Sequence, residues 1–211
     1  MPHTGISEHI DVAPPLRTIA AGAQRFLIAG TPRSRTAWLA ALCNTVPGTI
    51  CYHEPIAYHP TWQATARLWE GKNHERIGIS DSGFSFHIGA LIAMYRPRIL
   101  IVDRPEAEVY ASLAAVGIPL CNYHKLVMDA LEPWRDHSLV RSVPFDALAD
   151  NFTLHGCLWH LLPGAAIDMD KVGIFQRLNV QTDMRQVWKD AEGRDMREII
   201  GLAAAGRLRA V

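Results

Sequence analysis

The sequence predicts an α/β domain of three layers, in which a central parallel sheet is flanked by helices and the C-terminal part is helical. Short apolar runs without strict alternation recur along the chain, which is typical of strands that are covered on both faces. Helix-length segments separate these runs, as crossover connections between parallel strands require. After residue 150 the pattern is mostly helical.

Five runs are predicted as strands: residues 25–30, 48–54, 76–81, 98–104 and 138–145. Crossover helices are predicted within residues 36–46, 60–72, 84–95 and 106–117, and later helices within residues 151–162 and 168–178. No internal repeat or low-complexity linker divides the chain. We therefore expect a partly ordered lead-in over residues 1–24 and one domain over residues 25–211.

Size, charge and cysteine usage limit the class of protein. With 211 residues and 49% hydrophobic content, the chain is long enough to bury a core. Its 21 basic and 21 acidic residues cancel, which argues against partners such as nucleic acid or an anionic membrane. No stretch approaches the ~20 apolar residues of a membrane span, and the first residues lack a secretion-signal pattern. Four widely spaced cysteines favour reduced thiols, no zinc site and a cytoplasmic location.

The turn after the first predicted strand carries the strongest functional signal. It consists of Gly30, Thr31, Pro32, Arg33, Ser34, Arg35, Thr36 and Ala37. A glycine-led turn that enters a helix gathers backbone N–H groups around one point and binds anions, usually phosphate. Hydroxyls and two arginines strengthen this prediction. The ATP-binding pattern G-x-x-x-x-G-K-[ST] is not met, because Arg35 and Thr36 stand in place of its second glycine and its lysine.

The turn GTPRSRTAWL resembles the 5′-phosphosulfate-binding loop of the sulfotransferases, commonly written G-T-P-[RK]-S-G-T-T-W-L. Those enzymes have a P-loop-type α/β fold and take a sulfuryl group from 3′-phosphoadenosine 5′-phosphosulfate. The resemblance implies that the whole turn binds this donor, that Arg33 contacts the transferred group, and that Ser34 and Thr36 donate hydroxyls. Arg35 replaces the family's glycine and Ala37 its second threonine. If the backbone at residue 35 needs φ > 0, an arginine there costs about 1 kcal/mol.

A second segment, RILIVDRPEAEVYASL (98–113), resembles the strand-to-helix segment with which this family holds the donor's 3′-phosphate. Arg104 and Ser112 are the corresponding residues. Their eight-residue spacing places them about 80° apart on a helix, near enough to converge on one phosphate. The alternative is that Arg104 caps the strand and Ser112 packs. Later segments, VPFDALADN and IDMDKVGIFQRLNVQ, also resemble the family, and the second implies a donor contact from Arg177 or Asn179.

The general base is expected at the end of the second predicted strand. Sulfuryl transfer to an alcohol needs a base that takes the hydroxyl proton. The segment CYHEP (51–55) resembles the family's strand that ends in Glu-Pro, and the carboxyl ends of strands in a doubly wound sheet face the ligand. The third strand lacks the Lys-Thr-His pattern in which other branches carry a histidine base. Glu54 is therefore the expected base, His53 and His87 are reserves, and the alternative for Glu54 is an exposed strand-end acid.

Together, these motifs imply a sulfotransferase-like enzyme that acts on a hydroxyl or amine of a small-molecule or glycan acceptor, with a homodimer as one option. A sulfuryl group carries less charge than a terminal phosphoryl group, so amides, hydroxyls and one or two cations suffice and no metal is required. Trp62 and Trp69 share one helix face at i, i+7, where core packing is favoured over an acceptor pocket.

Two other functions stay open. A P-loop nucleotide or small-molecule kinase is favoured by the run ILIVD, because Asp103 resembles the aspartate that holds Mg²⁺ in such enzymes, and is disfavoured by the missing lysine. A non-catalytic relative that binds a nucleotide without turnover is favoured by the substitutions at Arg35 and Ala37.

Overall fold

The computed structural model describes residues 23–115 and 122–176, and in them five strands form one parallel sheet in the order β2-β3-β1-β4-β5. The strands are β1 (Gln24–Gly30), β2 (Thr49–His53), β3 (Arg76–Ser80), β4 (Arg98–Asp103) and β5 (Val140–Pro144). All five predicted strands are confirmed to within two residues at each end. The predicted α/β class, a parallel sheet flanked by helices, is confirmed.

Helices connect the strands, and two more follow the last strand. They are α1 (Thr36–Cys43), α2 (Trp62–Ala66), α3 (Ile88–Tyr95), α4 (Glu106–Ala114), α5 (Tyr123–Leu131), α6 (Asn151–Leu161) and α7 (Met169–Gln176). Short 3₁₀ turns accompany them: η1 (Pro55–Tyr58), η2 (Arg67–Glu70), η3 (Ser82–His87), η4 (Glu132–Trp134) and η5 (Asp146–Ala149). Each predicted helical segment contains one of these helices, usually in a shorter form.

Helix α5 was not predicted. Its buried residues His124, Val127 and Leu131 are spaced at i, i+3 and i+7, which places them on one helix face. Val127 and Leu131 pack with Leu27 and Ile101 of the sheet. Both sequence signals, the periodicity and the start residue, were present, because Asn122 at the start of the helix is of a residue type favoured there, although its side chain makes no cap hydrogen bond.

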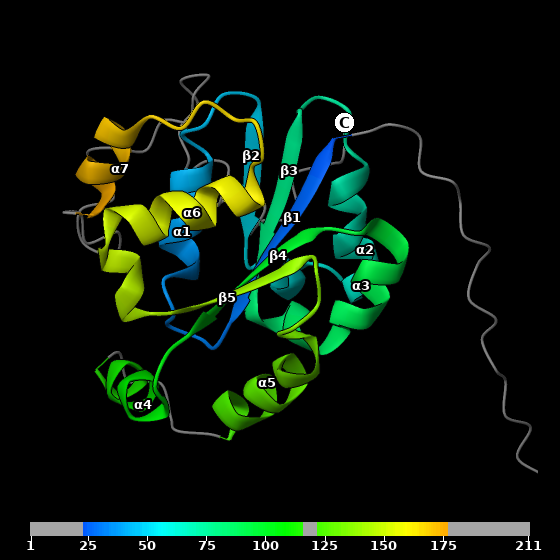
Figure 1. Cartoon of the computed structure of the whole chain (residues 1–211). Coiled ribbons are helices and arrows are strands. Elements are labelled where there is room, and N and C mark those ends of the chain that lie inside the picture. Colours follow the sequence, from blue (N-terminus) through cyan, green and yellow to red (C-terminus); the bar gives the residue numbers. More distant parts are fainter. Residues whose placement is uncertain (1–22, 116–121, 177–211) are drawn as a thin grey trace, which may run out of the picture.

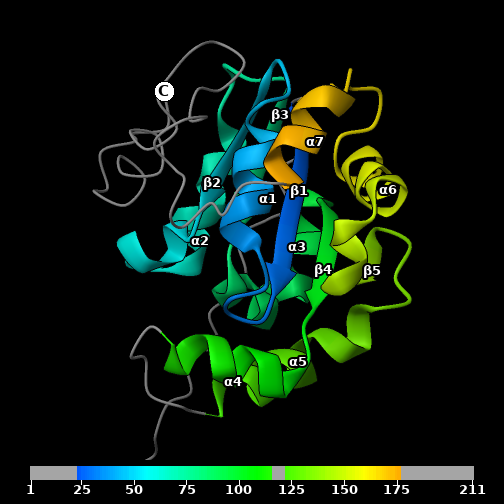
Figure 2. The ribbon, with the colours of Figure 1, turned by 90° about the vertical axis from the view of Figure 1, so that its left-hand side faces the viewer.

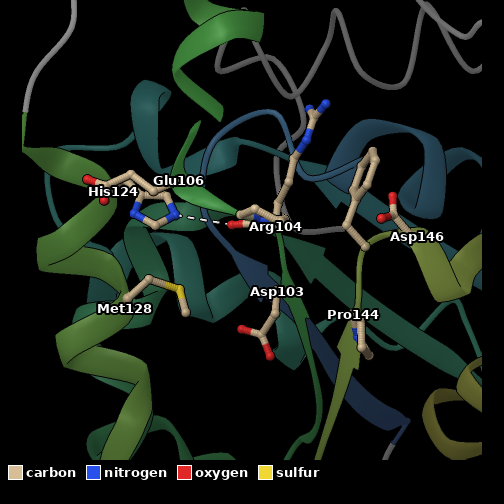
Figure 3. A pocket seen from close by; sticks show the side chains of 9 residues that line it. Asp103, Arg104, Glu106, His124, Met128, Pro144 and Asp146 are labelled. Atoms are coloured by element: carbon tan, nitrogen blue, oxygen red, sulfur yellow. Dashed lines mark hydrogen bonds between the residues drawn. The ribbon is translucent and has the colours of Figure 1, made fainter. Parts of the chain in front are cut away.

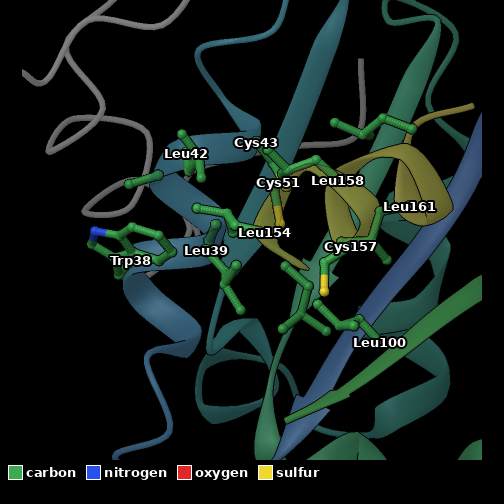
Figure 4. Close-up of a cluster of buried hydrophobic side chains, with 14 of the residues drawn as sticks. Trp38, Leu39, Leu42, Cys43, Cys51, Leu100, Leu154, Cys157, Leu158 and Leu161 are labelled. Atoms are coloured by element: carbon green, nitrogen blue, oxygen red, sulfur yellow. The ribbon is translucent and has the colours of Figure 1, made fainter. Parts of the chain in front are cut away.

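Both faces of the sheet are covered (Figures 1 and 2). Helices α1, α6 and α7 lie on one face and pack against Phe26, Ile28, Leu100 and Val102. Figure 4 shows the leucines and cysteines of α1 and α6 in this cluster. Elements α2, α3 and α5 lie on the other face, against residues such as Ile101. Because successive strand residues point to opposite faces, this division also decides which strand-end side chains can meet the turn after β1.

The strand order brings the carboxyl ends of β1, β3 and β4 together, because β1 lies between β3 and β4. A Cβ atom on Gly30 would lie 2.7 Å from the carbonyl oxygen of Val102, so only glycine permits this close approach of β1 and β4. Figure 2 shows α4 and α5 beyond this end of the sheet. Ligands of open α/β sheets bind at this edge.

Three of the four cysteines are buried free thiols: Cys43, Cys51 and Cys157. Burial raises the pKa of the Cys43 thiol to about 12. Cys121 and residues 1–22 of the expected lead-in lie outside the described residues. Within the described ranges, every helix is too short or too polar to cross a membrane.

Candidate functional site

The turn between β1 and α1 lies at the carboxyl edge of the sheet, and its hydroxyl groups are buried. Thr31 and Ser34 are fully buried, and their hydroxyl oxygens lie 2.7 Å apart. The Ser80 hydroxyl, at the end of β3, donates to the carbonyl of Thr36 over 2.9 Å. The predicted turn is therefore fixed both by its own side chains and by the neighbouring strand.

Two arginines of the turn have a left-handed backbone. The φ angle is 68° at Arg33 and 59° at Arg35, the residue that precedes α1. Glu54 and Arg96 are the other described non-glycine residues with positive φ, so three of these four residues lie at one edge of the sheet. A left-handed residue with a side chain costs about 1–2 kcal/mol. Such conformations gather at functional sites, where the surroundings compensate for them.

The positive φ at residue 35 leads to a stability prediction. We expect Arg35→Gly to unfold with a free energy about 1 kcal/mol higher than Arg35→Ala, because glycine adopts this conformation without a Cβ penalty. Both variants lose the arginine side chain, so their difference isolates the backbone. Urea unfolding of the two variants measures it. Equal stabilities would contradict a left-handed residue 35.

Arg33 connects the turn to the second predicted motif. Its Nε donates to the hydroxyl of Ser112 in α4 over 3.0 Å. Nη1 of Arg104 donates to the carbonyl of Arg33 over 2.6 Å, and Nε of Arg104 donates to Glu108 over 3.2 Å. The structure thus brings together three residues that the two motifs supplied from distant parts of the chain.

Phe145, which follows β5, contacts two of the arginines. The guanidinium carbons of Arg104 and Arg35 lie 4.2 and 4.9 Å from the centre of its ring. That of Arg35 also lies 5.6 Å from the ring of Trp38. Each such contact contributes about 0.5–1 kcal/mol. Burial lowers the pKa of Arg35, and the charge of Arg104 lowers it further. Positive charge is therefore concentrated beside the turn.

Phe145 lies in the segment VPFDALADN, which the sequence analysis matched without assigning a role to this residue. The sequence signal for its role was an aromatic residue at the end of a predicted strand. The expected donor contacts Arg177 and Asn179 lie outside the described residues.

His53 and Glu54, at the end of β2, lie beside the turn. Nε2 of His53 is 3.4 Å from the Thr36 hydroxyl and 3.7 Å from Oε1 of Glu54. Burial lowers the pKa of His53, against the opposing effect of the Glu54 carboxylate, so its imidazole is neutral at pH 7. The Glu54 side chain is 56% exposed. Both groups can accept a proton from a molecule that approaches the turn.

His87, the other reserve, lies at the end of η3 and stacks on Trp62, with ring centres 4.8 Å apart. Trp69 is fully buried and contacts the rings of Phe84 and Tyr95. The expected core role is therefore confirmed for Trp69, and Trp62 lies partly exposed on the same side of the sheet.

Asp81, directly after β3, had no role in the sequence analysis. Its side chain is buried, and its two oxygens accept the backbone N–H groups of Ile56 and Gly83 over 2.9 and 2.8 Å. Burial raises its pKa to about 6, the nearby Glu54 carboxylate adds to the rise, and the two hydrogen bonds oppose it. The sequence signal was an acid at a strand end, followed by Ser-Gly in a turn.

Asp103 and Arg104 leave the end of β4 in opposite directions (Figure 3). Asp103 belongs to the face away from α1, where both its oxygens accept from the guanidinium of Arg135 over 2.5 and 2.8 Å. This pairing raises the pKa of Arg135. In the described part of the chain, no group of three or more His, Cys, Asp or Glu residues is arranged to hold a metal ion.

An open pocket of about 390 Å³ adjoins Arg104 (Figure 3). The ends of β4 and β5, the start of α4, and His124 and Met128 of α5 line it. Nε2 of His124 is 3.2 Å from the Arg104 carbonyl. None of the turn residues 31–36 lines the pocket. The turn and the pocket are therefore separate but adjacent, because Arg104 lines the pocket and also donates to the carbonyl of Arg33 in the turn.

Comparison with protein-family models and with curated proteins finds no match to this chain.

Proposed function

We propose that this chain is a sulfotransferase-like enzyme with a P-loop-type fold, which transfers a sulfuryl group from 3′-phosphoadenosine 5′-phosphosulfate to a hydroxyl or amine of a small-molecule or glycan acceptor. One observation carries the proposal. Arg33 of the turn, Arg104 after β4 and Ser112 of α4 converge through contacts of 2.6 and 3.0 Å. These residues come from two separate motifs, each of which had been assigned to one of the donor's anionic groups.

In the proposed complex, the 5′-phosphosulfate lies against the turn. Backbone N–H groups at the start of α1, the hydroxyls of Ser34 and Thr36, and the Arg33 guanidinium are its donors. Arg104 and Ser112 bind the 3′-phosphate. ATP has no 3′-phosphate, so this pair distinguishes the sulfuryl donor from ATP.

The proposed transfer is a single displacement at sulfur. The acceptor oxygen forms a bond to sulfur while the bond from sulfur to the 5′-phosphate oxygen breaks, and the electron pair of that bond stays on the phosphate. Glu54 takes the acceptor's proton, with His53 placed between Glu54 and the turn. The N–H donors of the turn and Arg33 stabilise the charge that develops on the departing 3′-phosphoadenosine 5′-phosphate.

A kinase is less well supported. Thr36 occupies the position of the phosphate-binding lysine. The carboxylate of Asp103, the expected Mg²⁺ ligand, is paired with Arg135 on the other face of the sheet. The three buried free thiols suit a reducing compartment, which favours a cytoplasmic location.

Calorimetric titration with 3′-phosphoadenosine 5′-phosphate, beside ATP with Mg²⁺, tests the proposal. We expect micromolar binding of the first and binding at least tenfold weaker for the second. Preference for ATP with Mg²⁺ would favour the kinase. Tight binding of the bisphosphate without transfer to any acceptor in a panel would favour the non-catalytic relative. Binding of neither nucleotide would contradict all three functions.

A further inference from the structure

The buried Asp81 carboxylate connects the segments that follow two neighbouring strands. Its main-chain N–H donates to the carbonyl of Ile28 in β1 over 3.0 Å, which fixes the residue to the centre of the sheet. Its two oxygens accept N–H groups from η1, at Ile56, and from η3, at Gly83. Its residue exposure is 2%. One side chain therefore holds two turns against the same strand end.

Gly83 permits this close packing. A Cβ atom at this position would lie 3.0 Å from the Ile56 side chain and 3.2 Å from Oδ1 of Asp81. Both distances are shorter than about nine in ten real contacts of a Cβ atom. The carboxylate and the two turns thus form a tightly packed unit.

The residue held by this unit is Glu54. Its φ of 48° is unfavourable for a residue with a side chain, so neighbouring contacts must keep it in place. Its N–H donates to the carbonyl of Ser80 over 2.8 Å, directly before Asp81, and Ile56 follows two residues later. The backbone of Glu54 is therefore fixed between the end of β3 and the Asp81 carboxylate.

From this juxtaposition we propose that Asp81 is a positioning residue: by bridging the N–H groups of Ile56 and Gly83, it fixes the left-handed Glu54 beside the turn after β1. The role of Glu54 as base rests on the proposed function, whereas the bridge itself does not. Asp81 acts through Glu54 and contacts neither donor nor acceptor.

The bridge is strongest with the ionised carboxylate, because protonation turns one oxygen into a hydroxyl, which accepts an N–H group more weakly. The pKa of Asp81 is raised to about 6 by burial first and by Glu54 second, so both bonds are complete above this pH. The adjoining elements carry further titratable groups. Among them, His53 at the end of β2 and His87 at the end of η3 are the histidines, and burial lowers the pKa of each.

A double-mutant cycle on the full chain tests the positioning role. We expect Asp81→Asn to lower kcat at least tenfold and to change the KM for the donor less than twofold. In the Glu54→Gln background, we expect the same change to lower kcat less than twofold. Asp150→Asn is the control, because Asp150 likewise accepts an N–H group, that of Thr153, but at the start of α6. An unchanged kcat, or an equal loss in both backgrounds, overturns the role.

Proton–nitrogen NMR of the wild-type chain tests the bridge without any need for activity. The amide signals of Ile56 and Gly83 should shift together with a midpoint near pH 6. Both shifts should vanish in Asp81→Asn. Absence of a shared transition in the wild type overturns the bridge. If the shared transition occurs and the wild type transfers no sulfuryl group, the bridge stands and the proposed function fails.

Discussion

Replacing Arg104 with alanine is expected to weaken binding of 3′-phosphoadenosine 5′-phosphate by about 10- to 100-fold. In the proposed complex, Arg104 supplies a charged hydrogen-bond donor for the 3′-phosphate, and bonds of this kind contribute about 1.5–3 kcal/mol. It also holds the carbonyl of Arg33, so the turn loses a second support. Calorimetric titration of both proteins measures the loss. Binding of ATP should change less, since ATP has no 3′-phosphate.

Two further variants separate the specific role of Arg104 from the effect of losing a charge. Arg98→Ala removes an exposed arginine from the opposite end of the same strand and should leave nucleotide binding unchanged. Arg104→Lys keeps the charge but has a single ammonium group in place of the planar guanidinium. Its affinity for the bisphosphate should therefore lie between that of the wild type and that of Arg104→Ala. Thermal unfolding shows whether each variant is folded. A folded Arg104→Ala protein with wild-type affinity for the bisphosphate would exclude Arg104 from the donor site.

Replacing Glu54 with glutamine is expected to lower kcat by about 10²- to 10⁴-fold, the usual contribution of a general base. The amide has nearly the same shape as the carboxylate but accepts no proton at neutral pH. The Glu54 side chain is exposed, and its described neighbour, the neutral His53, lies 3.7 Å away, so little of the fold depends on the carboxylate. The Kd for 3′-phosphoadenosine 5′-phosphate should therefore stay within twofold of the wild type. Steady-state kinetics and calorimetry on one preparation give both values.

Glu75→Gln serves as the matched control for this experiment. Glu75 is an exposed acid at the opposite edge of the sheet, beside Arg76, and its amide variant should keep full activity. A His53→Asn variant identifies the base if the prediction is wrong. Full activity in Glu54→Gln together with a large loss in His53→Asn would assign the proton transfer to His53, whose Nε2 faces the Thr36 hydroxyl.

The secondary structure was predictable where apolar periodicity is strong. The five strands were recognisable as short apolar runs, because a strand that is buried on both faces of a sheet consists mostly of apolar residues. Helix α5 was missed, although His124, Val127 and Leu131 share one face and Asn122 before them is of a residue type favoured at helix starts. The order of the strands was beyond sequence reasoning. It depends on pairings such as Gly30 with Val102, which are set by how the crossover helices pack.

The sequence by itself determined which residues carry charge and hydroxyl groups at the turn, because the pattern of glycine, proline and arginine is local. Only the tertiary structure decided which of them meet. Arg33 contacts Ser112 because β1 and β4 are neighbours in the sheet, which brings together the segments that follow them. Asp103 turns away to Arg135 because alternate strand residues point to opposite faces of the sheet. The bridging role of Asp81 was equally out of reach, since Ile56 and Gly83 come together only when β2 and β3 pair. A contact between segments distant in sequence depends on the pairing and packing of the whole sheet.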